Sequence, residues 1–179
     1  MKTKLNQSKL KLAILSAMLV GSTGLSTAVY AAQTSGDNMI VNTNVLGACV
    51  VEAAQLTFAT YDPTAVVPNL AQAVIKSVCT LGSSAKLTMN QGTKADTAGG
   101  STDAAPLRRM LNTADGTTLA YSLYQDSSRN VVWGNTTATG KGFTAEISEN
   151  PVTVYGKIVS GLAATPGSFV DSVHVTLTY

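Results

Sequence analysis

Side chains that perform catalysis are scarce in this chain of 179 residues. It has a single histidine, His174, and charged residues make up 12% of the sequence. A hydrolytic or acid–base site needs a nucleophile with its base, a carboxylate pair or a metal cage. On the strand predicted at 173–179, His174 points to the opposite face from Asp171, which makes the two a poor dyad. We therefore expect no enzyme, no catalytic residue and no cofactor.

Cysteine is almost as rare, because Cys49 and Cys79 are the only two. Two thiols without a nearby histidine or further cysteine do not make a tetrahedral zinc site, so no metal is expected. An oxidising compartment would instead join them and leave no cysteine over. Closing a loop of this length is worth about 3.5 kcal/mol in the loop-entropy model. The sequence therefore predicts a disulfide.

The chain also lacks an apolar run long enough to cross a membrane as a mature helix. Four lysines precede the apolar stretch 12–20, which glycine, serine and threonine interrupt from Gly21 to Gly24. Small residues follow up to Ala31. This is the pattern of a secretory signal peptide, whereas a retained anchor would need roughly 20 apolar residues. We predict a signal peptide at 1–31, and export to the periplasm.

A basic surface is absent once that segment is removed. Of twelve basic and ten acidic residues, four basic and no acidic ones lie in 1–31, which leaves a net charge of −2. Phosphate backbones are bound by basic stripes, so nucleic acid is excluded as a partner. About 148 residues remain, which suits one domain.

What the chain has in abundance is period-two alternation of apolar and polar residues, which is typical of half-buried strands. Alternating sets occur at 39–45, 87–89, 119–123, 152–158 and 173–179. Turn signals such as Gly99-Gly100 and Pro166-Gly167 separate them, and no apolar stripe of helical period follows the signal peptide. The pattern predicts an all-β sandwich.

Three other segments give local predictions. Within the irregular stretch 55–72 we expect a short strand at 56–58 followed by a loop. Residues 134–141 resemble a phosphate-binding loop only superficially, because the glycine spacing is wrong, and we predict a hairpin loop. Arg108 and Arg109 are consecutive on a predicted strand, so at most one is buried, and it needs an acidic or carbonyl partner.

The two ends of the mature chain show complementary patterns. Residues 38–46 form an extended, uncharged strand pattern ahead of the first cysteine, and 173–179 alternates to the last residue without a polar tail. An uncovered apolar edge promotes aggregation, and a sandwich normally covers it. We therefore expect a spare strand at the start of the chain and a missing strand at its end.

Three blocks carry a family resemblance: Leu-Thr-Phe-Ala-Thr-Tyr-Asp-Pro at 56–63, the strand–loop–strand block from Leu107 to Gly134, and the ending from Val154 to Tyr179, with its Pro-Gly turn and final aromatic residue. Together with the positions of the cysteines, they resemble the spore coat protein U domain, the pilin domain of archaic (Csu-type) chaperone-usher systems. Ala59 stands where that family usually has glycine.

The resemblance implies an immunoglobulin-like β-sandwich that lacks its last strand, with 47–179 as the pilin domain and 32–46 as a donor strand segment. In such systems a periplasmic chaperone lends a strand, and at the outer-membrane usher the N-terminal segment of a neighbouring pilin subunit replaces it. The donor residues would be Met39, Val41, Thr43 and Val45. The acceptor edge, which also binds the chaperone, would be Val173, Val175, Leu177 and Tyr179, with the Tyr179 carboxylate as an anchor.

The implied function is that of a structural subunit of a surface pilus, serving adhesion and biofilm formation. The alternative from another class is a self-contained secreted β-sandwich that binds carbohydrate or a surface. Such a module would stay monomeric and soluble alone, whereas a fold that lacks a strand would aggregate, polymerise or need its chaperone.

Overall fold

Strands make up all the regular secondary structure in the part of the chain that the structure describes. The computed structural model describes residues 34–179, so the predicted signal peptide at 1–31 lies outside the described residues. Nine strands and no helix occur between 34 and 179, and a helix able to cross a membrane is accordingly not found there. The prediction of an all-β fold is confirmed.

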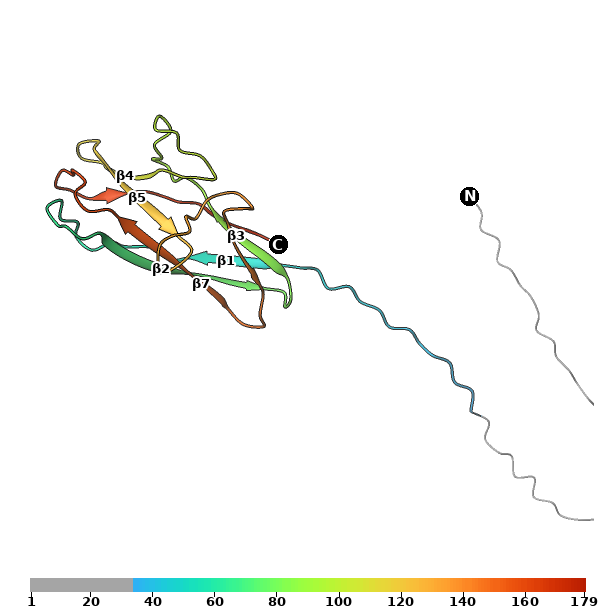
Figure 1. Cartoon of the computed structure of the whole chain (residues 1–179). Coiled ribbons are helices and arrows are strands. Elements are labelled where there is room, and N and C mark those ends of the chain that lie inside the picture. The colour runs from blue at the N-terminus through green and yellow to red at the C-terminus, as the bar shows by residue number, and fades with distance from the viewer. Residues whose placement is uncertain (1–33) are drawn as a thin grey trace, which may run out of the picture. The chain divides into compact units, whose positions relative to one another are not determined.

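The nine strands form two sheets whose paired strands are all antiparallel (Figure 1). The larger sheet has the strand order β1-β2-β7-β5-β4-β8, and the smaller one has the order β6-β3-β9. The bounds are β1 Cys49–Ala53, β2 Asn69–Cys79, β3 Ser84–Met89, β4 Arg108–Asn112, β5 Thr118–Tyr124, β6 Lys141–Thr144, β7 Asn150–Ile158, β8 Phe169–Val170 and β9 Val175–Thr178.

The core lies between the inner faces of the two sheets. Because successive side chains on a strand point to opposite faces, every second residue of β3, β5 and β7 enters it. Trp133 is fully buried in this core, and its indole Nε1 donates to the Leu87 carbonyl at 3.0 Å. The other buried members of the cluster are Ile75, Leu87, Met89, Leu119, Tyr121, Leu123, Val154 and Ile158.

Some of the strands predicted from alternation are present, some strands were not predicted, and some predicted strands do not form. The alternating sets at 87–89, 119–123 and 152–158 lie in β3, β5 and β7, whereas β1, β2, β6 and β8 were not predicted. No strand forms over 34–48 or at 56–58. The last strand begins at Val175, not at Val173, because the His174 amide donates to the side chain of Asn90, at 2.9 Å, and not to a neighbouring backbone.

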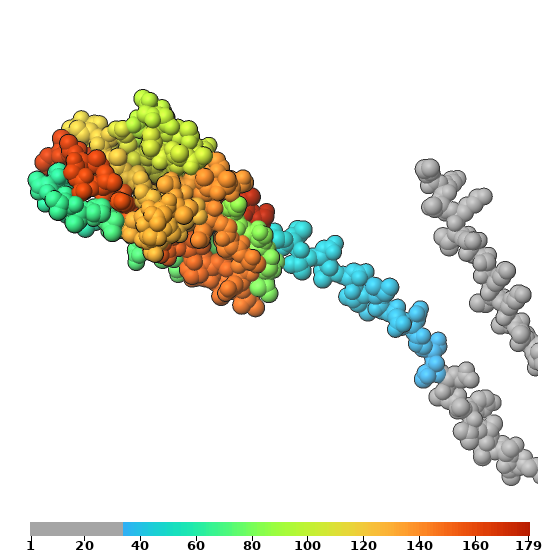
Figure 2. All heavy atoms as spheres, in the orientation of Figure 1, coloured from blue at the N-terminus to red at the C-terminus, as the bar shows by residue number. Residues whose placement is uncertain are grey.

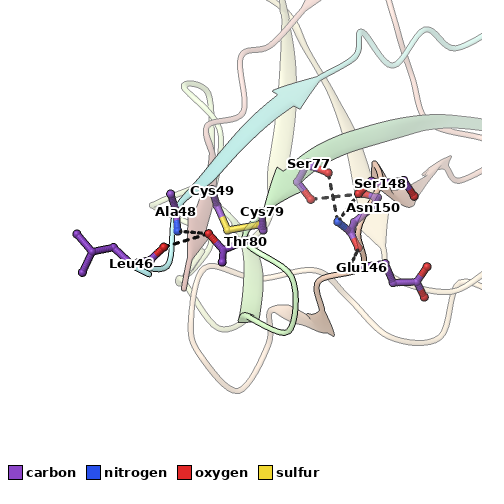
Figure 3. Close-up of a disulfide and its surroundings, with 9 residues drawn as sticks. All are labelled: Leu46, Ala48, Cys49, Ser77, Cys79, Thr80, Glu146, Ser148 and Asn150. Atoms are coloured by element: carbon purple, nitrogen blue, oxygen red, sulfur yellow. Dashed lines mark hydrogen bonds between the residues drawn. A yellow bond between two sulfur atoms is a disulfide. The ribbon is translucent and has the colours of Figure 1, made fainter. Parts of the chain in front are cut away.

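The disulfide between Cys49 and Cys79 ties the first strand to the longest one. The two cysteines face each other in the register of β1 and β2. On the far side of β2, Asn150 braces the loop that leads into β7: its Oδ1 accepts from the Glu146 amide at 2.9 Å, and its Nδ2 donates to the Ser148 carbonyl at 3.1 Å (Figure 3). The predicted disulfide is confirmed.

Gly156 of β7 makes room for Phe58, and this gives a first testable prediction. A Cβ at Gly156 would lie 2.7 Å from Phe58 Cζ and 3.1 Å from Leu56 Cδ2. We expect Gly156→Ala to lower the free energy of unfolding by about 1–3 kcal/mol, as overpacking does. Gly142→Ala is the control, since a Cβ there comes no closer than 3.7 Å to another atom. Urea unfolding of both variants would measure the difference, and equal midpoints would contradict the prediction.

Candidate functional site

One edge of the smaller sheet has no strand paired with it in the described chain. β9 pairs with β3 in the register Leu87↔Leu177 and Met89↔Val175, and it ends the order β6-β3-β9. Its other edge therefore presents backbone N–H and C=O groups without a ladder partner. Such an edge is a template on which another extended segment can pair.

A hollow of about 1100 Å³ lies beside this edge. One wall consists of residues 53–61, which continue from β1, and the opposite wall consists of 164–173 and Val175. We call this hollow the groove. Its floor is the core itself, formed by Ile75, Met89, Met110, Leu119, Tyr121, Leu123, Val154 and Ile158. A groove with a core for its floor exposes apolar surface that a folded domain normally covers.

The acceptor residues predicted from the sequence are brought together only in part. Val173 and Val175 line the groove, and both pack half-buried against the core. Leu177 also packs against the core but does not line the groove. Tyr179 is exposed and lies near Gly47, where a Cβ would be 4.0 Å from the Tyr179 ring. The alternate residues His174, Thr176 and Thr178 face solvent.

The wall formed by 53–61 was not recognised from the sequence as part of a site. Leu56 and Phe58 pack half-buried against the core, and Phe58 meets Tyr121 edge-on with ring centroids 6.3 Å apart. The alternation of Leu56 and Phe58 predicts only a short strand and gives no sign of a groove. In the structure Leu56 and Phe58 belong to no strand, and both line the groove.

Two loops close one end of the groove. The Tyr61 hydroxyl accepts from the Leu162 amide at 2.8 Å and lies 3.1 Å from the Val159 carbonyl, to which it donates. These contacts tie the chain around residue 61 to the loop that follows β7. Figure 2 shows the two segments side by side at the left end of the domain, in teal and red.

A polar cluster lies where the groove meets the loop after β3. The Tyr121 hydroxyl donates to Asp171 Oδ2 at 2.6 Å, and the Thr93 amide donates to Asp171 Oδ1 at 2.9 Å. Burial, followed by the bond to Asp171, raises the pKa of Tyr121 well above its usual range. Tyr121 therefore stays neutral and donates. Asp171 serves as a structural acceptor here, and His174 is exposed.

The predicted donor residues are exposed and belong to no strand. Met39 is 85% exposed, and Val41 and Val45 are each 79% exposed. Thr43 is exposed as well. Exposed aliphatic residues that alternate along one segment are suited to fill pockets once the segment pairs with a sheet edge.

The groove has the chemistry of a binding site for an extended, apolar segment. Its floor is apolar, and one wall is a strand edge with free backbone groups. Between residues 34 and 179, no three histidine, cysteine or acidic side chains come together as metal ligands would. Peptide recognition by strand addition needs only the features that are present: backbone groups for affinity and pockets for alternate side chains.

Comparison with known proteins gives a family and a fold. The family model of the Spore Coat Protein U domain matches residues 36–176. Protein U of Myxococcus xanthus is 40% identical over 159 residues, a match that covers 83% of this chain and 87% of the relative. The resemblance predicted from the sequence is confirmed.

A solved structure is similar in fold at low sequence identity. It comes from a chaperone–tip adhesion subunit pre-assembly complex of the archaic chaperone-usher Csu pili of Acinetobacter baumannii. The TM-score is 0.55 at 17% identity, and the match covers 75% of this chain but only 40% of the other.

Proposed function

This chain belongs to the Spore Coat Protein U domain family, and we propose that it is a structural subunit of a surface pilus. In this proposal subunits join head to tail by strand exchange. The N-terminal segment of one copy, with Met39, Val41, Thr43 and Val45 turned inward, pairs with β9 of the next copy. A periplasmic chaperone occupies the same groove beforehand, and an outer-membrane usher is the place of exchange.

The groove beside β9 is the observation that carries the proposal. It combines an unpaired strand edge with an apolar floor made of core residues. A strand laid between 53–61 and 169–175 would reach the free edge of β9 at Val175, where backbone hydrogen bonds can form, and would cover Met89 and Tyr121. Burial of apolar surface stabilises by about 25 cal/mol per Å², so a partner that fills the groove adds to the stability of the fold.

The disulfide and the net charge of the mature chain agree with such a role. The disulfide requires an oxidising compartment, as the periplasm is. The predicted net charge of −2 offers no attraction to nucleic acid. In a pilus the subunit would serve adhesion and biofilm formation at the cell surface.

Deletion of residues 37–45 tests the proposal. The groove remains intact, so we expect the shortened chain to bind its chaperone with unchanged affinity. Joining of subunits should be lost, because no donor strand is left. Co-purification with the chaperone and counting of fibres by electron microscopy measure the two properties separately.

A matched control replaces 37–45 by the same residues in shuffled order, with the apolar residues moved out of alternation. We expect this chain also to fail in joining, although its length is unchanged. Fibres that form from either variant would show that this segment is not the donor.

A further inference from the structure

A single threonine holds the point at which the N-terminal segment leaves the domain. The Thr80 hydroxyl accepts from the Ala48 amide at 3.0 Å and donates to the Leu46 carbonyl at 3.1 Å. The backbone amide of Thr80 donates to the Ala48 carbonyl at 2.8 Å. Figure 3 shows this arrangement beside the disulfide. A hydroxyl can both donate and accept, and Thr80 uses both capacities on the same short stretch of chain.

The surroundings of the bonds make the stretch 46–48 part of the domain. Thr80 directly follows Cys79, which is bonded to Cys49. The backbone of Gly47 lies against Ser83 and Tyr179, so that a Cβ there would be 3.7 Å from Ser83 Oγ. By contrast, residues 43–45 form no hydrogen bond with the described chain, and Val45 is 79% exposed. The boundary between held and free chain therefore falls at Leu46.

We propose that Thr80 is a positioning residue that makes the joint between the donor segment and the domain rigid. This inference rests on the proposed function. If Val45 is the last residue seated in the neighbouring groove, only Leu46, Gly47 and Ala48 separate it from β1. An extended chain spans at most about 3.6 Å per residue, so the link is too short to bend freely. Because Thr80 fixes the chain direction at Leu46, it sets the angle between successive subunits.

The hydroxyl can be removed without loss of the fold. In Thr80→Val the shape of the side chain is kept, the disulfide remains, and the backbone bond from residue 80 to Ala48 is unaffected. Both bonds of the hydroxyl are at exposed positions, so water can replace them at little cost. The bond to the Leu46 carbonyl and the bond from the Ala48 amide are both lost, so Leu46 keeps no hold, whereas Ala48 is still held by the backbone bond. Thr80→Ser keeps the hydroxyl and serves as the matched control.

The first experiment measures backbone motion in the mature chain bound to its chaperone. We expect ¹⁵N order parameters at Leu46 and Gly47 of about 0.85 in the wild type and in Thr80→Ser, and below about 0.6 in Thr80→Val. Residues of β2 are the internal reference and should not change. Equal order parameters in Thr80→Val and the wild type would overturn the inference.

The second experiment measures the bending of assembled fibres by electron microscopy. Thr80→Val fibres should form in normal number but with a shorter persistence length, and Thr80→Ser fibres should match the wild type. If Thr80→Val loosens Leu46 but leaves bending unchanged, other contacts set the angle and the inference is wrong. If the wild type itself forms no fibres, the proposed function fails, whereas the order parameters still decide whether Thr80 holds Leu46.

Discussion

Replacement of Arg108 by alanine is expected to lower the free energy of unfolding by about 3–5 kcal/mol. Arg108 is 1% exposed, on the inner face of β4. Its Nη2 donates to the carbonyls of Met89 at 3.0 Å, Asn90 at 2.7 Å and Trp133 at 2.9 Å. The side chain thus braces the larger sheet against the end of β3, and its loss leaves these carbonyls without a donor.

The charge of Arg108 is retained in this apolar setting. Burial lowers its pKa to about 10, while the nearby Tyr121 and Asp171 act in the opposite direction. The group is therefore still protonated at neutral pH, and each of its bonds to a carbonyl is charge-assisted. A leucine would fill the volume but leave the carbonyls unsatisfied, so Arg108→Leu should be destabilised too. Arg108→Lys keeps the charge without the planar fork and should fall between leucine and the wild type.

Arg109 is the matched control because it is the next residue on the same strand. It points to the opposite face and pairs with Asp96, with both side chains partly exposed to solvent. Pairs of this kind contribute about 0–1 kcal/mol, so Arg109→Ala should scarcely change stability. Urea unfolding can be followed by the fluorescence of Trp133, the only tryptophan. Equal losses in the two alanine variants would contradict the role assigned to Arg108.

The sequence allowed one of these arginines to be buried, and it named the kind of partner needed, a carbonyl or an acid. The sequence does not tell which arginine is buried, because either of two consecutive strand residues can point to the inner face. The structure decides this through Met89, Asn90 and Trp133, which are far from Arg108 in sequence. Long-range acceptors of this kind leave no local signal.

The longest strand escaped prediction for a related reason. The outward face of β2 mixes Leu70, Val74 and Val78 with Gln72 and Lys76, whereas its inward face carries Ala71, Ala73 and Ser77 with one large aliphatic residue, Ile75. Apolar residues therefore lie on both faces, and hydrophobicity does not alternate along the strand as burial does. Small residues stand inside because Leu56 and Phe58 pack over this part of the sheet, beside Gly156. The large side chains that fill this part of the core come from residues 56–58, and alternation within β2 alone cannot reveal them.

Residues of one wall of the groove could be predicted from the sequence, whereas those of the other wall could not. Val173 and Val175 stood out because their alternation is strict, and both line the groove. The wall at 53–61 depends on where the chain parts from β2 after Ala53, the last residue of β1 to pair with it. A strand edge without a partner is a property of the sheet order and not of any residue.

Aspartate at Val41 or Val175 is expected to abolish the joining of subunits. An unpaired carboxylate in an apolar groove costs several kcal/mol, and at about 1.4 kcal/mol per tenfold this reduces the joined fraction more than a hundredfold. Val175 packs against the core beside the groove. Val41 belongs to the predicted inward set of the donor, so both changes place the charge in the same interface from opposite sides.

The two variants should differ in chaperone binding. Val41→Asp alters only the donor segment, so the groove and chaperone binding remain intact. Val175→Asp alters the groove and should weaken both chaperone binding and joining. Co-purification with the chaperone distinguishes these two patterns, and fibre counts measure joining.

The neighbouring residues provide controls with the same charge on the other face. Thr176 is exposed on β9, and Asn42 alternates with the predicted inward residues, so Thr176→Asp and Asn42→Asp should join normally. If Asn42→Asp blocked joining and Val41→Asp did not, the donor would be shifted by one residue, because a one-residue slip turns every side chain to the opposite face. If all four variants joined normally, strand exchange at β9 would be excluded. Whether joining is blocked at Val41 or at Asn42 therefore shows which donor residues point into the groove.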